Sequence, residues 1–377
     1  MIVIEAGNKK VVFFLESLSL GGIGRLTLLL AEYFADQGYD VNLFLAKTEG
    51  DYLSQVPAGI NVVNKKNTRV LFSLHSVGSY LKNTKPDALI AANERINIVA
   101  LLAKILYRSK TRIIISTHIN NSEQIRHEKR GAAIYLYRKA ALLAARLVYK
   151  WADHVVAVSK GVADDMRKLF KLSPERIKVI YNPIVTPGLK VKMKAPAEHA
   201  WFRQPGGPVI LGIGRLAVQK DFFTLIDAFV EIRKTIPEAR LIILGEGEER
   251  KPLENKISAL NIDDYVSMPG FVNNPYSYLY NSSVFVLSSA WEGFGNVLVE
   301  AMATGTPVVA TDCPSGPAEI LEYGKYGPLV PVGDAKGLAR SVIAVLKDQP
   351  DPGFLQNRAN DFTVEKAFEK YQELINS

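Results

Sequence analysis

Cysteine is almost absent from this sequence: Cys313 is the only one in 377 residues. A single cysteine excludes an intramolecular disulfide and is typical of a reducing compartment. The first ten residues show no apolar core after a basic start, so they do not resemble a secretory signal. No apolar run reaches the roughly 18 to 20 residues that span a bilayer. We therefore expect a cytoplasmic protein, soluble or peripheral on the inner face of the cell membrane.

A complete nicotinamide-dinucleotide fingerprint is also missing. That fingerprint opens with one glycine and needs another at the sixth position, where a helix packs closely on a strand. Counted from each candidate first glycine, the sixth position holds Thr27, Ala217 or Arg250. The sequence therefore argues against a dinucleotide-dependent oxidoreductase.

Negative charge is scarce in the first half of the chain. Residues 1–185 hold 27 Lys+Arg against 15 Asp+Glu, which gives +12, whereas residues 186–377 hold 19 against 23, which gives −4. Residues 104–150 alone contain 11 basic and 2 acidic residues. Such a block attracts the phosphates of an anionic lipid, a nucleic acid or a phosphorylated ligand. A merely solvated basic face is the alternative.

Short apolar runs alternate with helical patterns along the chain. In the first half, strand-like runs occur at 11–15, 41–45, 88–91, 112–115 and 155–158. These runs are continuously apolar and do not alternate with polar residues, which implies that both faces of the sheet are covered. The pattern predicts a parallel sheet between layers of helices.

A stretch rich in Pro, Gly and Lys at 183–208 interrupts this alternation, and the same pattern then begins again. The predicted fold class is α/β, with two Rossmann-like, doubly wound lobes and a ligand in the cleft between them. The predicted divisions are a first lobe over 1–186, a linker over 187–207, a second lobe over 208–360, and a C-terminal helix over 361–377 that packs back on the first lobe.

The most specific motif is Glu-Gly-Phe-Gly-Asn-Val-Leu-Val-Glu, from Glu292 to Glu300. A strand ends before it and a helix opens near Asn296. A helix start offers unpaired N–H groups and a positive dipole end, so Gly295, Asn296 and Val297 suit a diphosphate. Glu300 lies about one turn inside the helix, within reach of ribose hydroxyls. Glu292 precedes the glycine loop, where its carboxylate can accept hydrogen bonds from a sugar.

Two cations follow another predicted strand. Gly214 and Arg215 lie at the end of that strand, and Lys220 follows five residues later. Arginine binds phosphate bidentately and lysine binds it as a point charge, so both can stabilise a departing nucleoside diphosphate. A Gly-Gly-Ile-Gly segment that contains Gly22 follows the first strand, and its glycines allow close approach of the backbone to a ligand.

These segments resemble glycosyltransferase family four of the GT-B fold, whose hallmark is two glutamates separated by seven residues, here Glu292 and Glu300. The run Ala-Met-Ala-Thr-Gly-Thr-Pro-Val-Val after Glu300 strengthens the resemblance. It extends over about residues 11–375 and is stronger in the second lobe. The resemblance implies a retaining transfer from a nucleotide-sugar, in which the departing phosphate helps to deprotonate the acceptor.

The resemblance also implies roles for individual residues. Arg215 and Lys220 would bind the donor's phosphates, and His118, in a Ser-Thr-His segment after a strand, would lie near the transferred sugar. A structural role in a loop remains the alternative for His118. The predicted catalytic residues are Glu292, His118, Arg215 and Lys220. The predicted donor-binding residues, which include two loops around the base, are Gly22, Gly214, Arg215, Lys220, Gly247, Phe271, Gly295, Asn296, Val297 and Glu300.

No Asp-x-Asp segment occurs in the sequence, so the usual metal-carboxylate donor site of single-lobed transferases is missing. We expect no metal ligand and no cofactor. Arg215, Lys220 and the helix that opens at Asn296 would do the work of a metal ion.

The predicted function is transfer of a hexose or N-acetylhexosamine from a UDP-sugar to a saccharide acceptor, lipid-linked, in surface polysaccharide or glycan biosynthesis. The segment 312–321 resembles a loop variant common among enzymes that build surface polysaccharides. A sugar-nucleotide epimerase or phosphorylase of related shape, or a non-catalytic nucleotide-sugar-binding protein, are the alternatives. No nucleic-acid motif was found in the basic block, so nucleic acid is not an expected partner.

An anionic membrane surface is the other expected partner. A helix is predicted over 133–151, within the basic block. Each basic residue near an anionic membrane contributes about 1 kcal/mol to the free energy of binding to that membrane. In the alternative interpretation the leucines of this helix face the protein core. The residues predicted to share one side are Lys139, Arg146 and Lys150, and those predicted to form an apolar stripe on the other side are Leu136, Leu143 and Leu147.

Overall fold

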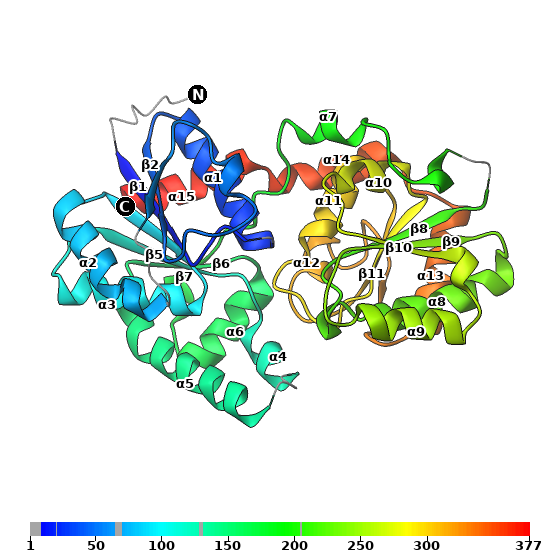
Figure 1. Ribbon diagram of the computed structural model, residues 1–377, viewed down its shortest axis with the longest axis horizontal. Helices are drawn as coiled ribbons and strands as arrows, with labels where there is room; N and C mark the ends of the chain where they lie inside the picture. Colours follow the sequence, from blue (N-terminus) through cyan, green and yellow to red (C-terminus); the bar gives the residue numbers. More distant parts are fainter. Residues whose placement is uncertain (1–8, 20, 65–69, 128–130, 204–205) are drawn as a thin grey trace. The chain divides into compact units, whose positions relative to one another are not determined.

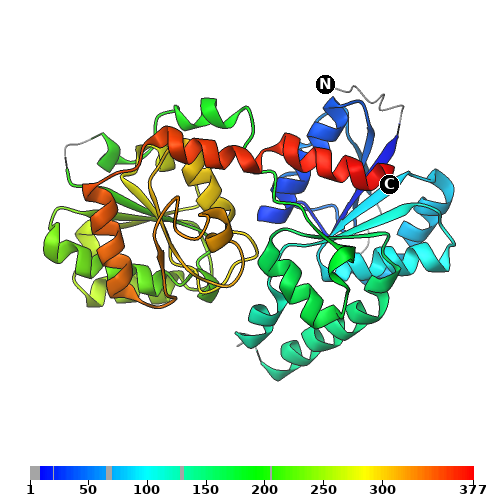
Figure 2. The same ribbon diagram turned by 180° about the vertical axis from the view of Figure 1, so that it is seen from behind.

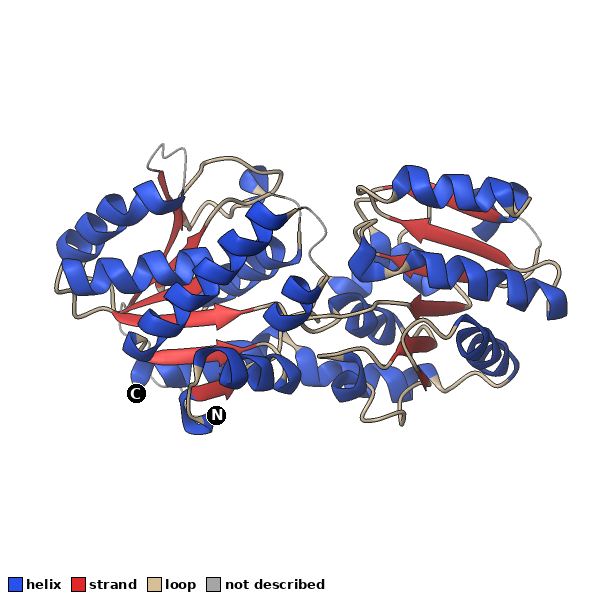
Figure 3. Ribbon diagram, turned by 90° about the horizontal axis from the view of Figure 1, so that it is seen from below, coloured by secondary structure: helices blue, strands red, loops and turns tan. Residues whose placement is uncertain are grey.

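The structure is a computed structural model that describes residues 9–19, 21–64, 70–127, 131–203 and 206–377. The chain divides into two compact units (Figure 1). The first unit comprises Met1–Pro183 together with Val364–Ser377, and the second comprises Ile184–Thr363. Each unit contains one parallel sheet with helices on both sides of the strands (Figure 3). The predicted fold class of two doubly wound α/β lobes is confirmed.

The sheet of the first unit has the strand order β3-β2-β1-β4-β5-β6-β7, and all of its pairings are parallel. Strand β1 is central, with Val11 opposite Val41 of β2 on one side and Ala88 of β4 on the other. Its continuous apolar run is buried because helices cover both faces. The strands are β1 (Lys10–Leu15), β2 (Asp40–Leu45), β3 (Asn61–Asn64), β4 (Ala88–Ala92), β5 (Arg112–Thr117), β6 (His154–Ala157) and β7 (Ile177–Val179).

The helices of the first unit follow these strands. Polar caps fix some of their starts: the Asn93 side chain accepts a hydrogen bond from Ile96 N at 3.1 Å, as expected for an N-cap. Short 3₁₀ turns include η2 (Val70–Phe72) and η3 (Tyr149–Trp151). The helices are α1 (Gly22–Asp36), α2 (Ser73–Thr84), α3 (Glu94–Leu106), α4 (Asn121–Arg126), α5 (Ala132–Val148), α6 (Lys160–Phe170) and α15 (Val364–Asn376).

The C-terminal helix α15 belongs to the first unit and lies beside α1 (Figure 2). Its Phe368 ring packs edge-on against Phe34 of α1, with ring centroids 4.6 Å apart. The Arg112 guanidinium donates to the carbonyl oxygen of Ile375 at 2.7 Å. The last helix of the sequence thus completes the hydrophobic core around β1 and α1.

The sheet of the second unit has the order β10-β9-β8-β11-β12-β13, again parallel. Its strands are β8 (Val209–Ile213), β9 (Arg240–Leu244), β10 (Val266–Gly270), β11 (Val284–Leu287), β12 (Val308–Thr311) and β13 (Leu329–Val330). The helices are α7 (Leu189–Met193), α8 (Phe222–Thr235), α9 (Arg250–Ala259), α10 (Pro275–Asn281), α11 (Asn296–Thr304), α12 (Pro317–Ile320), α13 (Ala335–Lys347) and α14 (Pro352–Ala359).

The predicted linker at 187–207 is wrong as a boundary between the units. The chain crosses from the first unit to the second between Pro183 and Ile184, and it returns between Thr363 and Val364. Residues 189–193 form α7, which contacts α10 and α11 inside the second unit. The Asn274 side chain donates to the carbonyl oxygen of Lys192 at 2.8 Å. This Pro- and Gly-rich stretch is therefore part of a folded unit.

Within the described ranges, none of the helices combines the length and the apolar character that a bilayer crossing requires.

Candidate functional site

The carboxyl ends of four neighbouring strands bring most of the predicted residues together in the second unit. Strands β10, β9, β8 and β11 are consecutive in the sheet. Phe271 follows β10, Gly247 follows β9, and Gly214 follows β8, while the motif from Glu292 follows β11. Because all four strands are parallel, the loops after them emerge at the same edge, where open α/β sheets bind ligands.

Two of the predicted catalytic side chains are ion-paired. Lys220, at the end of η6 (Val218–Lys220), places its Nζ 2.5 Å from Oε1 of Glu292. The Ser289 hydroxyl donates to the same oxygen at 2.7 Å. Only 7% of the Glu292 side chain and 17% of the Lys220 side chain are exposed. The sequence placed both residues in the site but gave no indication that they contact each other.

Gly214 makes room for this lysine. A Cβ at position 214 would lie 3.1 Å from three methylene carbons of Lys220. The loops that carry the pair are also joined, because the Ser288 hydroxyl donates to the carbonyl oxygen of Lys220 at 2.8 Å. The Gln219 side chain donates to the carbonyl oxygen of Trp291 at 2.9 Å. These contacts hold the ammonium group at the end of β8 in one position.

Arg215, the second predicted cation, is exposed and makes no hydrogen bond or ion pair with any described residue. Its guanidinium group has donors in a planar fork and keeps them available to an anion. Arg215 directly follows Gly214, the residue that lies against the Lys220 side chain. The end of β8 therefore carries one fixed and one freely accessible positive charge.

Helix α11 opens at Asn296, as predicted. Its N-cap, Gly295, has φ 100° in the left-handed region and provides no side-chain cap. The start of the helix, with Val297 half-buried in the first turn, adds a positive dipole end to the site. Glu300 is buried, with 4% of the residue exposed, and lies in the second turn.

A second glycine shapes the loop before α11. Gly316 has φ 102°, and a Cβ there would lie 1.7 Å from the carbonyl oxygen of Phe294. The segment before Gly316 is also bound to the motif, since Glu292 N donates to the carbonyl oxygen of Pro314 at 3.1 Å. A larger residue at 316 would displace the loop, so this glycine supports the site although the sequence did not single it out.

The loop after β9 lies directly on the loop after β8. A Cβ at Gly245 would approach the carbonyl oxygen of Gly214 to 2.0 Å, and one at Gly247 would approach that of Leu216 to 2.2 Å. Leu216 N donates to the carbonyl oxygen of Glu246 at 2.9 Å. Glycines at 245 and 247 are thus required for two backbone segments to touch.

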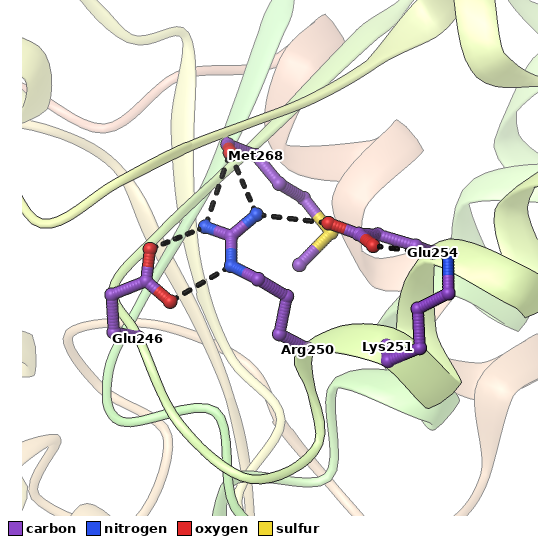
Figure 4. A network of polar contacts seen from close by, with 5 residues as sticks. All are labelled: Glu246, Arg250, Lys251, Glu254 and Met268. Carbon is purple, nitrogen blue, oxygen red and sulfur yellow. Dashed lines mark hydrogen bonds and ion pairs between the residues drawn. The ribbon is translucent and has the colours of Figure 1, made fainter.

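Arg250 holds this loop from the other side (Figure 4). Its guanidinium group lies between two carboxylates: Nε and one terminal nitrogen bind Glu246 at 2.8 and 2.7 Å, and the other terminal nitrogen binds Glu254 at 3.1 Å. Both terminal nitrogens also approach the carbonyl oxygen of Met268 at 3.3 Å. Hydrogen bonding from Arg250 holds the pKa of the Glu246 carboxyl below its usual value.

This network, which includes Lys251 at 3.8 Å from Glu254, was not predicted as part of the site. It joins the loop after β9 to the end of β10, directly before Phe271, which is 54% exposed. Arg250 and Glu254 lie four residues apart at the start of α9, and this spacing was the signal that could have indicated part of the network.

The other two predicted residues belong to the first unit. Gly22 is exposed and is the first residue of α1; residue 20 of the same loop lies outside the described residues. His118 follows β5. Gly22 and His118 therefore belong to a different compact unit from the other predicted site residues.

The protonation of His118 follows from its neighbours. The Ser116 hydroxyl donates to the carbonyl oxygen of Ala91 at 3.0 Å and lies 3.1 Å from His118 Nε2. With the hydroxyl hydrogen directed at Ala91, Nε2 is assigned as the donor and Nδ1 as the acceptor. Nδ1 is buried without a hydrogen-bond partner in the described structure. Burial lowers the pKa of His118 to about 4, against a smaller raising effect of Asn182, so the ring is neutral near pH 7.

His118 lines a cavity of about 20 Å³ that Tyr371 of α15 also lines. A cavity of this size holds about one water molecule. The neutral ring therefore lies beside a small cavity whose lining is mainly apolar and includes a few polar side chains, among them Thr27 and Asn182.

The predicted membrane helix is α5 together with η3. The interpretation in which its leucines face the core is wrong, because Leu136, Leu143 and Leu147 are 63%, 60% and 59% exposed. The prediction that the basic residues and the leucines lie on opposite sides of this helix is also wrong. Lys139 lies three residues after Leu136 and four before Leu143, and such spacings are neighbours on a helix. The basic residues therefore border the exposed leucines.

Among the described residues, no group of three or more His, Cys, Asp or Glu side chains is placed to hold a metal ion.

Comparison with known proteins assigns the family. The family model described as glycosyl transferases group 1 matches residues 197–362, and the one described as Glycosyltransferase Family 4 matches residues 20–186. An uncharacterized glycosyltransferase of Methanocaldococcus jannaschii is 30% identical over 346 residues, which cover 81% of this chain and 83% of the relative.

A second relative has a specific name. The N-acetylgalactosamine-N,N'-diacetylbacillosaminyl-diphospho-undecaprenol 4-alpha-N-acetylgalactosaminyltransferase of Campylobacter jejuni is 30% identical over 289 residues, 77% of this chain and 74% of the relative. The crystal structure of HepE of Anabaena with UDP-glucose has the same fold, with a TM-score of 0.80 at 22% identity, over 97% of this chain and 99% of that one. The chain therefore belongs to the GT-B glycosyltransferases of family four.

Proposed function

We propose that this glycosyltransferase transfers a hexose or N-acetylhexosamine from a UDP-sugar to a lipid-linked saccharide, with retention of configuration and without a metal ion. The observation that carries the proposal is the Lys220–Glu292 pair, with Arg215 on the same loop after β8 and the start of α11 four residues after Glu292. Two cations and a helix dipole at one sheet edge suit a diphosphate leaving group. The relative of known fold that binds UDP-glucose supports the choice of nucleotide.

In the proposed site, Arg215 and Lys220 bind the two phosphates and Glu300 accepts hydrogen bonds from the ribose. Glu292 accepts hydrogen bonds from the sugar, and its pairing with Lys220 fixes its position. The loops that contain Gly247 and Phe271 would contact the base. This arrangement supplies position and electrostatic stabilisation, with no protein nucleophile.

The reaction balances within donor and acceptor. The bond between the anomeric carbon and the diphosphate oxygen breaks, and the acceptor oxygen bonds to the same face of the sugar. The acceptor hydroxyl proton moves to the departing phosphate, whose developing charge Arg215 and Lys220 neutralise. These protein cations provide the stabilisation that a metal ion provides elsewhere.

The acceptor side of the proposal is supported by the first unit. The Campylobacter relative is named for a diphospho-undecaprenol acceptor. In this chain α5 presents exposed leucines bordered by Lys139 and Arg146, and η3 continues it with Lys150 and with Trp151, which is 44% exposed. Apolar side chains flanked by cations are typical of helices that lie in the interface of an anionic bilayer.

Donor turnover tests the chemical part. Purified protein is assayed for hydrolysis and transfer with a panel of UDP- and GDP-sugars, with and without a divalent-metal chelator. Lys220→Ala and Glu300→Ala should lower turnover about 100- to 1,000-fold, as removal of a catalytic electrostatic donor does, whereas Lys234→Ala, on the exposed face of α8, is the control. Wild-type turnover in both variants, or complete loss in chelator, would overturn the site.

Liposome co-sedimentation tests the membrane part. The triple variant that replaces Lys139, Arg146 and Lys150 with Glu should lose binding to anionic vesicles, and wild-type binding should fall with salt. The matched control makes the same charge change in the second unit, at the exposed Lys190, Lys192 and Lys194. Equal recovery of all three proteins on anionic vesicles would contradict a membrane role of α5.

A further inference from the structure

The first unit contains a cavity of about 550 Å³ that none of the predicted site residues lines. This volume lies within the range of small-molecule sites, roughly 300 to 1,000 Å³. Its walls come from η2, α3 and α5, and its lining is mainly apolar. Three alanines of α5 form one wall, Ala140, Ala141 and Ala144, and their small side chains leave the space open.

One end of the cavity is charged. Arg95, in the first turn of α3, donates to Glu16 at 2.7 Å, and Lys47 lies 3.6 Å from the same carboxylate. All three side chains line the cavity. A second carboxylate, Glu49, lies 3.8 Å from Lys47 but is 63% exposed. Arg95 is 51% exposed and uses one terminal nitrogen in its ion pair, so it retains donors for a phosphate.

The apolar end of the cavity is continuous with the surface of α5. Leu71 of η2 and Tyr137 of α5 line the cavity, and they are 63% and 59% exposed. The neighbouring Leu136 is exposed as well. The lining of the cavity therefore includes large, exposed side chains of η2 and α5, along which an apolar chain could leave it.

We propose that the cavity binds the diphosphate-proximal isoprene units of a polyprenyl diphosphate, the lipid portion of the acceptor. The isoprenoid chain lies among the α5 alanines and Leu71, and its diphosphate contacts Arg95 and Lys47. The apolar walls complement the chain of such a lipid, and Arg95 and Lys47, which share the Glu16 carboxylate, supply donors for its anionic head. This inference rests on the proposed use of a lipid-linked acceptor.

Filling the cavity tests the proposal. Ala144→Phe occupies the space, and Ala133→Phe adds the same ring at an exposed position of α5 that does not line the cavity. With a prenyl-diphosphate-linked saccharide, Ala144→Phe should raise the KM about 10-fold or more, since the ring excludes part of the apolar chain and each apolar contact of methylene size is worth about 10- to 200-fold. The KM for the nucleotide-sugar and the rate of donor hydrolysis should stay at wild-type values.

Direct binding separates this inference from the proposed function. Farnesyl diphosphate and inorganic diphosphate are titrated calorimetrically into the full chain without any donor. Farnesyl diphosphate should bind at least 10-fold more tightly than diphosphate, and Arg95→Ala and Ala144→Phe should each weaken it while Ala133→Phe does not. Equal affinity for the two ligands, or unchanged binding in Ala144→Phe, overturns the cavity assignment even if sugar transfer is found. Absence of sugar transfer with intact farnesyl diphosphate binding would instead overturn the proposed function alone.

Discussion

At the scale of single residues, the site depends on a pair of opposite charges with little access to water. Lys220 and Glu292 lie 2.5 Å apart, and each is more than four-fifths buried. An unpaired buried charge is far more costly than a neutral polar group in the same place. The effect of Lys220→Ala on turnover is therefore interpretable only together with its effect on stability.

We expect Lys220→Ala to lower the free energy of unfolding by about 3 to 5 kcal/mol, because it leaves the Glu292 carboxylate without its cation. Adding Glu292→Gln should restore part of that loss, since the amide carries no charge. Urea denaturation of the wild type, both single variants and the double variant measures the coupling. Strict additivity of the two single effects would mean that the pair contributes nothing in solution.

His118 should make the first unit sensitive to acid. Its native pKa of about 4 is below the ordinary value of 6.5. Between these two values the unfolded chain binds a proton that the native state does not, so stability falls as the pH falls, by about 1.4 kcal/mol per pH unit. His118→Asn should flatten this part of the pH–stability curve, measured by thermal unfolding from pH 7 to 4. The exposed His75→Asn should leave it unchanged, and an equally steep curve for His118→Asn would refute the assignment.

Individual site residues could be predicted from the sequence where motif spacing and glycine positions marked them. The two glutamates and the cations after β8 all lie at the predicted sheet edge. Contacts between loops could not be read in the same way. Arg250 binds the carbonyl oxygen of Met268, and this contact requires the neighbouring positions of β9 and β10 in the sheet. Only the folded sheet order brings those residues together.

At the scale of elements, α5 shows what a periodic pattern leaves open. Leucines at 136, 143 and 147 have the spacing of a core-facing stripe, and the same spacing occurs on a membrane-facing helix. In the structure only Ala145 and Val148 of α5 are buried. The helix packs on α3 and α6 through this narrow side. Whether an apolar stripe on a helix is buried depends on which other elements pack against it. The spacing of the apolar residues does not contain that information.

Helix α15 is expected to be essential to the first unit. Phe368 is 6% exposed and packs against Phe34, Tyr33 and Tyr39. Phe368→Ala should cost about 3 to 5 kcal/mol, because it removes a buried aromatic ring and leaves a cavity. Glu373→Ala, on the exposed side of the same helix, is the control. Denaturant unfolding that shows equal stability of the two variants would mean that α15 contributes little to the core.

At the scale of the whole molecule, the chain enters and leaves the second unit once. The first unit is built from two separate segments, whereas the second is the continuous segment from Ile184 to Thr363. Composition predicted two lobes but misplaced the boundary, because Pro and Gly are frequent both in linkers and in ordered loops. The stretch from 187 to 207 contains α7 and η5 (Ala200–Phe202), and only its packing on α10 and α11 reveals its unit.

This organisation predicts that residues 184–363 fold alone and bind the donor nucleotide. The segment has its own hydrophobic core and contains every predicted donor residue except Gly22. It should unfold cooperatively, and UDP at 100 times its Kd should stabilise it by about 2.7 kcal/mol. The same segment with Glu300→Ala should fold but gain little from UDP.

The segment 1–183 provides the contrast, because it lacks α15 and thus part of the core around Phe34. It should show no cooperative thermal transition, whereas the same segment joined through a flexible linker to residues 364–377 should regain one. Scanning calorimetry of the isolated segments measures both transitions. A cooperative transition in 1–183 without α15, or its absence in 184–363, would show that the two units do not fold independently along these boundaries.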